Sequence, residues 1–302
     1  MFRKTILVFI FAFCAIAIAA QTSDDETKVL DAKIKNAIKG FKGDVWVCAK
    51  NLDTGKDYAL RADEQVRTAS TIKLPIMAEV YRQVEAGKFK WDHKLTIPAF
   101  DPGGGSGVLK EFTPGINIDL KTAVIMMTVV SDNLATNLII ETITADAVNK
   151  FMAELGLKDT LSMRKVGGYE SGGLSTALKE DDSLRRFGLG RSSPRDMVKL
   201  LELLENGKVV SKEASAEMIA ILKRQQYKTG LGRNAASGVQ VASKSGWLDR
   251  LRSDVGILYT PGGRIAMAIT VDNMETANSN IDNPGIQLVW KLSEILQEAL
   301  SK

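Results

Sequence analysis

The segment Ala69-Ser70-Thr71-Ile72-Lys73 places a hydroxyl group and an amine three residues apart. Apolar residues recur at intervals of three and four from Ile72 to Val84, which is the period of a helix with one buried face. Residues three apart share one side of a helix, so the Lys73 amine can reach the Ser70 hydroxyl. A lysine that loses its proton through burial could then activate the serine. The N–H groups of a first helical turn lack internal partners and could stabilise an oxyanion. The spacing is therefore typical of acyl transfer.

The same spacing also has a purely structural interpretation. Ser70 could cap the helix beside a solvated Lys73. The segment Ser162-Met163-Arg164-Lys165 repeats the spacing, and we expect it to be exposed and without chemistry. The serine and lysine therefore need support from other parts of the chain.

Composition argues against other common active sites. The sequence contains one histidine, His93, within the charged segment Lys90-Trp91-Asp92-His93-Lys94, which reads as surface. A serine, histidine and aspartate triad would have to use it. Two cysteines and one histidine also make a zinc site on those ligands unlikely to form. We expect no metal and no cofactor.

The first twenty residues have the pattern of a signal peptide. Arg3 and Lys4 precede an apolar run over residues 6–20, and Ala17-Ile18-Ala19 is a small-x-small cleavage site. We therefore expect a periplasmic or secreted protein. Phe13 precedes Cys14 where a lipidated cysteine needs a small residue, and no later apolar run reaches the roughly 20 residues of a membrane helix, so we expect no stable membrane anchor.

Cleavage of this leader leaves a chain that is nearly neutral. It lowers the formal charge from +4 to about +2, because 38 basic residues then face 36 acidic ones. This balance argues against nucleic acid as a partner. Only Cys48 remains, so no internal disulfide can form and a packed core must stabilise the chain. We expect a monomer.

Hydrophobic periodicity predicts an α/β fold built from both ends of the chain. Residues 45–49 and 58–60 read as a hairpin, and three β-branched runs follow at 239–244, 254–259 and 265–272. Apolar helices are predicted between these two groups of strands. The expected fold is an antiparallel sheet of about five strands flanked by N- and C-terminal helices, with an inserted all-helical domain. We assign residues 21–68 and 227–302 to the α/β domain and 69–226 to the helical domain, with the active site at their interface.

Three polar residues, Ser131-Asp132-Asn133, separate two apolar helices predicted at 120–130 and 134–143. Buried polar groups cost about 1–3 kcal/mol unless they are paired, so this turn needs a reason. It is either a helix-to-helix turn capped by Asp132 or Asn133, or a place where Ser131 and Asn133 project into a cleft.

A third polar cluster, Lys244-Ser245-Gly246, follows a predicted strand near the end of the chain. With Ser70-x-x-Lys73 and Ser131-Asp132-Asn133 it completes, in chain order, the set S-x-x-K, S-D-N and K-T/S-G. The chain thus resembles the penicillin-recognising serine hydrolases, and most closely the class A β-lactamases, over nearly all of its mature length. Arg252-Ser253-Asp254 and Pro261-Gly262-Gly263-Arg264 extend the resemblance.

The resemblance implies catalytic roles for Ser70, Lys73 and Ser131, and for Glu170 as the candidate deacylating base. Ser70 would attack the lactam carbonyl, with Lys73 as the candidate base. The N–H groups of Ser70 and Trp247 would form the oxyanion hole. Ser131 would relay a proton to the leaving nitrogen. A further set would bind a small β-lactam substrate. Asn133 would bind its side-chain amide, and Lys244 and Ser245 its carboxylate, together with Arg250 or Arg252. Gly246 and Trp247 are also assigned to substrate binding.

This sequence departs from the class A pattern at the deacylating base. Class A enzymes carry E-x-x-L-N in the long loop after the S-D-N helix, and here the nearest match, Glu170-Ser171-Gly172-Gly173-Leu174-Ser175, is one residue too long and ends in serine. Glu170 is either that base or a solvated acid.

The leading hypothesis is a β-lactam hydrolase. The alternatives are a penicillin-binding or sensor-like protein that stays acylated, and a D-Ala-D-Ala peptidase or esterase.

Overall fold

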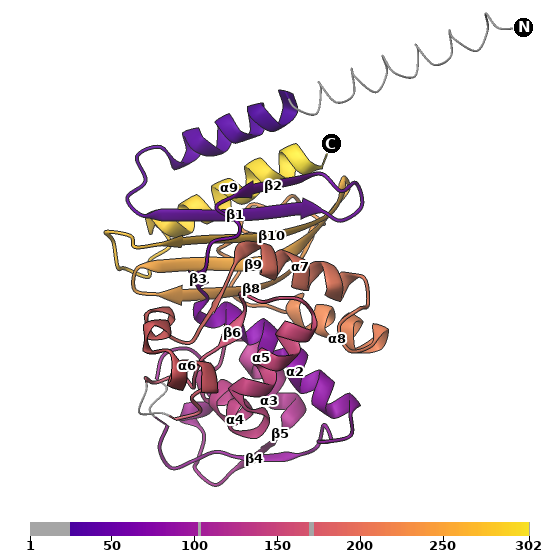
Figure 1. Ribbon diagram of the computed structural model, residues 1–302, viewed down its shortest axis with the longest axis vertical. Helices are drawn as coiled ribbons and strands as arrows, with labels where there is room; N and C mark the ends of the chain where they lie inside the picture. Colours follow the sequence, from indigo (N-terminus) through magenta and orange to yellow (C-terminus); the bar gives the residue numbers. More distant parts are fainter. Residues whose placement is uncertain (1–24, 102–103, 169–171, 302) are drawn as a thin grey trace, which may run out of the picture. The chain divides into compact units, whose positions relative to one another are not determined.

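Five strands form an antiparallel sheet that joins the two ends of the chain. The computed structural model describes residues 25–101, 104–168 and 172–301. The strands are β1 (Asp44–Asn51), β2 (Asp57–Leu60), β8 (Gln240–Leu248), β9 (Leu251–Thr260) and β10 (Gly263–Asp272). They pair in the order β2-β1-β10-β9-β8, so β8 is an edge strand (Figure 1). The predicted five-stranded antiparallel sheet is confirmed.

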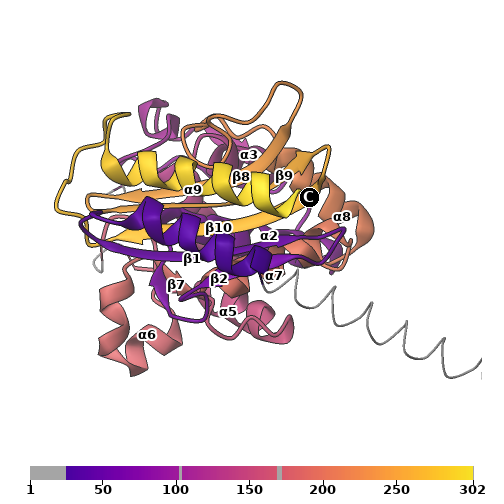
Figure 2. The same ribbon diagram turned by 90° about the horizontal axis from the view of Figure 1, so that it is seen from above.

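Alternation of side chains along β10 buries both faces of this sheet. Ala266 and Ala268 join the main hydrophobic core, which they share with the helices inserted between β2 and β8. On the other face, α9 (Pro284–Leu300) lies along β10 and β9 (Figure 2). There the Ser293 hydroxyl contacts the Met267 sulfur at 3.7 Å. The sheet is therefore a central layer with helices on each side.

Helices from the middle of the chain build the main core on the face of the sheet opposite α9. In Figure 1 they lie below β8. Two buried helices predicted from their apolar runs begin close to the expected residues, and Asp119 and Asp132 cap them with their side chains. The helices are α2 (Lys73–Glu85), α3 (Leu120–Val129), α4 (Asn133–Ile143), α5 (Ala145–Glu154), α7 (Pro194–Glu205) and α8 (Lys212–Leu222). The division of the chain into two domains at residues 68 and 226 remains a prediction.

The stretch 158–190, which shows no sustained period, contains short elements. They are β6 (Leu161–Ser162), α6 (Thr176–Glu180), η4 (Asp182–Phe187) and the start of β7 (Gly190–Ser192), and β7 pairs with both β6 and β3 (Val66–Arg67). Met163 and Leu178 belong to a small core of this stretch. Ser162 is fully buried, so the expectation that its segment is exposed is wrong. A further two-stranded sheet joins β4 (Lys94–Thr96) and β5 (Asn117–Asp119), and η2 (Leu109–Glu111) lies between them in the chain.

The N-terminal part of the chain forms a separate unit. Residues 25–38 are helical, while the predicted signal peptide lies outside the described residues. Within the described ranges, no helix has both the length and the hydropathy that crossing a bilayer requires.

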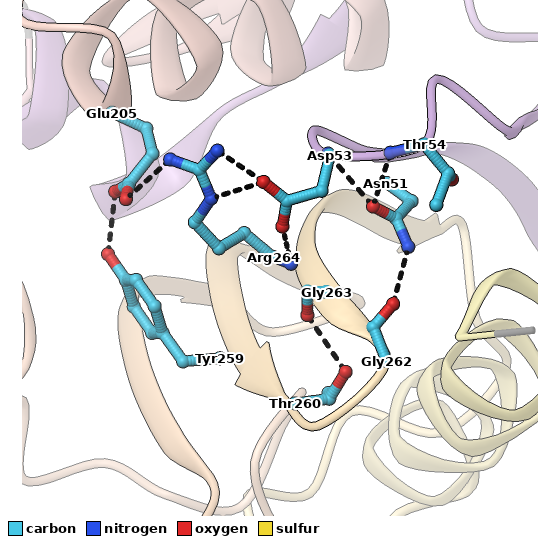
Figure 3. Close-up of polar contacts among 9 residues, drawn as sticks. All are labelled: Asn51, Asp53, Thr54, Glu205, Tyr259, Thr260, Gly262, Gly263 and Arg264. Carbon is cyan, nitrogen blue, oxygen red and sulfur yellow. Dashed lines mark hydrogen bonds and ion pairs between the residues drawn. The ribbon is translucent and has the colours of Figure 1, made fainter.

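Hydrogen bonds of the Asn51 side chain join the end of β1 to two other parts of the fold (Figure 3). Its Nδ2 atom donates to Leu300 O at 2.7 Å and to Gly262 O at 3.0 Å. Its Oδ1 atom accepts the N–H groups of Asp53 and Thr54 at 2.9 and 3.1 Å. One fully buried amide thus holds the β1–β2 turn, the β9–β10 turn and the end of α9 together.

Arg264 adds an ionic link beside this amide (Figure 3). Its guanidinium binds Asp53 and its own N–H donates to the same carboxylate at 2.7 Å. Glu205 at the end of α7 accepts from Arg264 at 3.3 Å and from the Tyr259 hydroxyl at 2.7 Å. Hydrogen bonds and an ion pair therefore tie this end of the sheet to the end of α7.

We expect Asn51→Ala to lower the free energy of unfolding by about 2–4 kcal/mol, because it leaves buried carbonyl oxygens without donors. Thr54→Ala removes an exposed hydroxyl from the same turn and should cost less than about 0.5 kcal/mol. Urea unfolding of the two variants measures both values. Equal costs for the two would contradict the role given to the Asn51 amide.

Candidate active site

The turn that carries Ser70 begins as a 3₁₀ helix and continues as an α-helix. Its first four residues form η1 (Ala69–Ile72), and α2 starts at Lys73. The Lys73 N–H bonds to the carbonyl oxygens of Ser70 and Thr71, so the serine and the lysine share one tightly wound turn. Ala69 adopts a φ of +46°, a strained value for a residue with a side chain. Ser70 is partly exposed at the start of a buried helix.

The Lys73 side chain is fully buried and reaches the polar turn between α3 and α4. Its Nζ atom donates to Ser131 O at 2.7 Å and to Asn133 Oδ1 at 2.9 Å. It also lies 3.2 Å from Ser131 Oγ. Two of the three predicted clusters therefore meet at this amine.

Lys244 approaches the same hydroxyl from the sheet. Its Nζ atom is 3.0 Å from Ser131 Oγ and 2.8 Å from Ser245 O, and its side chain is fully buried. Ser131 Oγ thus lies between two lysine amines. A hydroxyl can accept from one amine and donate to a neutral one, so this triplet can pass a proton.

Burial changes the proton affinity of both lysines. It lowers the pKa of Lys244 to about 7, against a smaller opposing effect of the Asp254 carboxylate. Burial first, and then the positive charge of Lys244, holds the pKa of Lys73 well below its usual value of 10.5, against a smaller effect of Asp132. Burial therefore favours the neutral form of Lys73, which is the form that a general base requires.

The edge strand β8 packs directly against the turn of the candidate nucleophile. A Cβ atom built at Gly246 would lie 2.6 Å from Thr68 O and 2.9 Å from Ser70 N. Only glycine allows this approach of two backbones. The clusters at 70–73, 131–133 and 244–246, far apart in the chain, therefore converge in space.

Asp132 explains why polar residues interrupt the buried helices. Its Oδ1 atom caps α4 by accepting the Ala135 N–H at 2.9 Å. Its Oδ2 atom accepts the N–H groups of Val108 and Leu109 at 2.6 and 2.9 Å. The capping interpretation of the turn thus holds for Asp132, while Ser131 and Asn133 face the lysines.

Loop 104–108 covers this turn, and its contribution was not predicted. The Ser106 hydroxyl donates to Ser131 O at 2.9 Å, and its carbonyl accepts the Asn133 N–H at 3.0 Å. The Asn133 Nδ2 atom donates to Gly104 O at 2.8 Å. The sequence marks this segment as a glycine-rich loop but gives no signal that singles out Ser106.

The loop that contains Glu170 is anchored to α4. Asn137, one turn after Asn133, accepts the Val166 N–H at 2.7 Å and donates to Val166 O at 3.2 Å. This bidentate contact fixes the start of the loop beside the helix that lines the site. Glu170 itself lies outside the described residues, so its role remains a prediction. The i, i+4 spacing of the two asparagines was the available sequence signal.

Arg252 lies near the site, and its side chain is hydrogen-bonded to the backbone. Its side chain is 1% exposed, and its Nη atoms donate to the carbonyl oxygens of Leu248, Leu251 and Asn278. It faces the Trp247 ring at 5.2 Å. The predicted binding roles of Ser245, Trp247 and Arg252 remain predictions.

Comparison with known proteins identifies the family. Residues 29–300 match the Beta-lactamase2 family, a beta-lactamase enzyme family. The chain belongs to this β-lactamase family. A β-lactamase crystal structure from Sphaerobacter thermophilus is 30% identical, with a TM-score of 0.76 over 89% of this chain and 96% of that one. The suspected family and its β-lactamase/transpeptidase-like fold are confirmed.

Two further proteins are similar at lower identity. An imipenem-hydrolysing β-lactamase of Enterobacter cloacae is 24% identical over 82% of this chain and 78% of its own length. A variant of PBP-A, solved as an acyl-enzyme complex with penicillin G, is 23% identical with a TM-score of 0.77, over 90% of this chain and 96% of that one. The latter likeness shows the shared fold.

We expect Gly246→Ala to slow acylation of this β-lactamase-family chain by 10²-fold or more, because the added methyl group pushes β8 away from the Ser70 turn. The rate at which an acyl adduct forms on Ser70 measures this change in the acylation rate. Gly238→Ala is the control: its φ of +88° strains an alanine but its Cβ meets open space. It should cost about 1 kcal/mol of stability and leave acylation unchanged.

We expect the stability of the folded chain to rise with pH above about 7. The unfolded chain holds the Lys244 proton up to about pH 10.5 and the folded chain up to about pH 7. Between these values the unfolded chain binds more protons, so the free energy of unfolding increases by about 1.4 kcal/mol per pH unit for this lysine.

Urea unfolding at pH 7, 8 and 9 tests this slope. Lys244→Met should reduce the slope by about 1.4 kcal/mol per pH unit, which is the contribution of one proton. Lys179→Met, at an exposed position, is the control for losing a surface charge. An unchanged slope in Lys244→Met would show that the buried amine is not the source.

Proposed function

We propose that this chain is an exported, class A type β-lactamase that opens β-lactam rings through an acyl-enzyme on Ser70. The observation that carries the proposal is the convergence of Lys73 and Lys244 on Ser131 Oγ, beside the Ser70 turn. In this proposal the arrangement supplies a base, a proton relay and an oxyanion site for Ser70. The N-terminal pattern with Ala17-Ile18-Ala19 supports export.

In acylation, the neutral Lys73 amine takes the proton of Ser70 as Ser70 Oγ attacks the lactam carbonyl carbon. The N–H groups of Ser70 and Trp247 stabilise the oxyanion, an effect worth about 3–4 kcal/mol per donor. The C–N bond then breaks as Ser131 donates its proton to the ring nitrogen. Lys73 passes the proton that it took from Ser70 to Ser131, which restores the hydroxyl and the neutral amine. The product is an ester on Ser70.

The positive end of the site is suited to the carboxylate of a β-lactam. Lys244 presents a buried amine next to Ser245, and a substrate carboxylate there would favour the protonated amine. Asn133 would bind the side-chain amide of the substrate. Its amide already contacts Lys73 and Gly104, so substrate must share or replace one of these bonds.

The sequence favours a second candidate function, a penicillin-binding protein that is acylated and deacylates poorly. The candidate deacylating acid, Glu170, stands in a sequence that departs from the class A pattern. A positioned general base contributes about 10²–10⁴-fold, so this single residue separates the two functions.

We expect sustained turnover of a chromogenic cephalosporin by the wild-type chain, and a mass adduct trapped on Ser70 early in the reaction. Ser70→Ala should abolish both signals. Ser162→Ala alters the other S-x-x-K serine, which is buried in β6, and should retain them. A stoichiometric burst followed by a persistent adduct would instead support the penicillin-binding function.

A further inference from the structure

The Ser131 carbonyl oxygen accepts hydrogen bonds from two different elements. Lys73 Nζ, at the start of α2, donates to it at 2.7 Å, and Ser106 Oγ, in loop 104–108, donates to it at 2.9 Å. Both distances are normal for hydrogen bonds. Ser131 is buried, so these two donors share an oxygen that meets little water. The proposed chemistry uses the lysine and the Ser131 hydroxyl but assigns no role to Ser106.

The backbone of loop 104–108 fixes the position of Ser106. The Ser106 carbonyl accepts the Asn133 N–H at 3.0 Å, so the serine is joined to the turn by its backbone as well as by its hydroxyl. A Cβ atom built at Gly107, the next residue, would lie 2.5 Å from Asp132 Cα, and only glycine permits this contact. Ser106 carries the only hydroxyl of the loop.

The acceptors around Lys73 determine where its lone pair points. A neutral lysine amine has two N–H groups and one lone pair. Ser131 O and Asn133 Oδ1, at 2.7 and 2.9 Å from Nζ, can only accept, so each takes an N–H group. The lone pair is then left for a hydroxyl, and Ser131 Oγ lies at 3.2 Å. The direction in which the amine accepts a proton therefore depends on where the Ser131 carbonyl is held.

That carbonyl belongs to a residue in a strained conformation. Ser131 has a φ of +56°, which residues with a side chain rarely adopt. The N–H on the other side of the same peptide group, that of Asp132, donates to Met126 O at 3.0 Å. The Ser106 hydroxyl holds the oxygen side of this peptide group, and the Met126 carbonyl holds the nitrogen side. The two bonds together oppose rotation of the peptide group.

We propose that Ser106 is a positioning residue whose hydroxyl holds the Ser131 carbonyl in place and shares this acceptor with Lys73. A carbonyl oxygen has two lone pairs, and each donor that it accepts draws on the same electron density. An ammonium makes stronger hydrogen bonds than a neutral amine, so a carbonyl bonded to Lys73 alone would favour its protonated form. The inference rests on the proposed acylation of Ser70, in which Lys73 is the base.

Within the described residues, Lys244 and Asp132 are the charged groups that act on Lys73. Lys244 Nζ lies 3.0 Å from the Ser131 hydroxyl, which Lys73 also contacts. Both carboxylate oxygens of Asp132 accept backbone N–H groups. None of these contacts involves the Ser106 hydroxyl, so its removal leaves them in place. A change in the titration of Lys73 on removing that hydroxyl can therefore be assigned to the Ser131 carbonyl.

Ser106→Thr and Ser106→Val form a matched pair, because the two side chains have the same shape and differ in the hydroxyl. The rate constant of Ser70 acylation by a penicillin is measured as a function of pH from the mass adduct. We expect Ser106→Thr to resemble the wild-type chain. Ser106→Val should acylate about 2- to 10-fold more slowly at neutral pH, which is the effect of one hydrogen bond. The acid limb of its profile should move to higher pH, with unchanged affinity for the non-covalent complex.

Two further variants control for bulk and for the loss of a hydroxyl elsewhere. Ser106→Ala adds no atoms and should match Ser106→Val. Thr113→Val removes an exposed hydroxyl after η2 and should leave the profile at its wild-type position. Equal profiles for Ser106→Thr and Ser106→Val would overturn the proposal. A Ser106→Val rate that is lower by the same factor at every pH would also overturn it, because loosened packing alone produces that result.

An NMR titration of the lysine side chains supplies a test that does not need acylation. The Lys73 signal, assigned by its loss in Lys73→Met, should lose its proton at higher pH in Ser106→Val than in Ser106→Thr. An identical Lys73 titration in the two variants would refute the shared acceptor. A wild-type chain without any Ser70 adduct would instead refute the proposed function, and the NMR comparison would still decide whether Ser106 and Lys73 share the carbonyl.

Discussion

Two fully buried lysines share one serine hydroxyl, and the rest of the site depends on how the fold tolerates them. Removing an ammonium group from water costs several kcal/mol even after the protein relaxes. Lys73 and Lys244 lie within 3.2 Å of Ser131 Oγ, so two positive charges here would also repel each other. The fold reduces both costs by favouring neutral amines, and a neutral amine is what a general base requires. Burial therefore favours the form of Lys73 that the proposed mechanism needs.

The burial in turn requires a close approach of segments that are far apart in the chain. Ala69, which precedes Ser70, and Ser131 itself adopt positive φ values of +46° and +56°. Such conformations cost about 1–3 kcal/mol each and persist only where the surrounding packing enforces them. The apolar faces of α2, α3 and α4 supply that packing in the main core. Stable helices thus hold strained turns at the residues to which the proposed chemistry is assigned.

The sequence predicted the helices, strands and polar clusters that depend on a local pattern of residues. The helices that became α3 and α4 and the late strands were found from their apolar periods, and the three polar clusters from their motifs. Strands of two or three residues, such as β6, contain too few positions to show a period, which is why Ser162 was wrongly expected to be exposed. Ser106 acquires its contacts with the 131–133 turn from the folded arrangement, and no spacing along the chain reveals such neighbours.

Asp132 shows how the same site avoids neutralising its own base. A carboxylate paired directly with Lys73 would favour the protonated amine and raise its pKa. Both oxygens of Asp132 instead accept backbone N–H groups, from Ala135 at the start of α4 and from Val108 and Leu109 in the covering loop. Its effect on the pKa of Lys73 is accordingly smaller than the effects of burial and of Lys244. The carboxylate beside the base therefore organises the backbone and leaves the amine free to accept a proton.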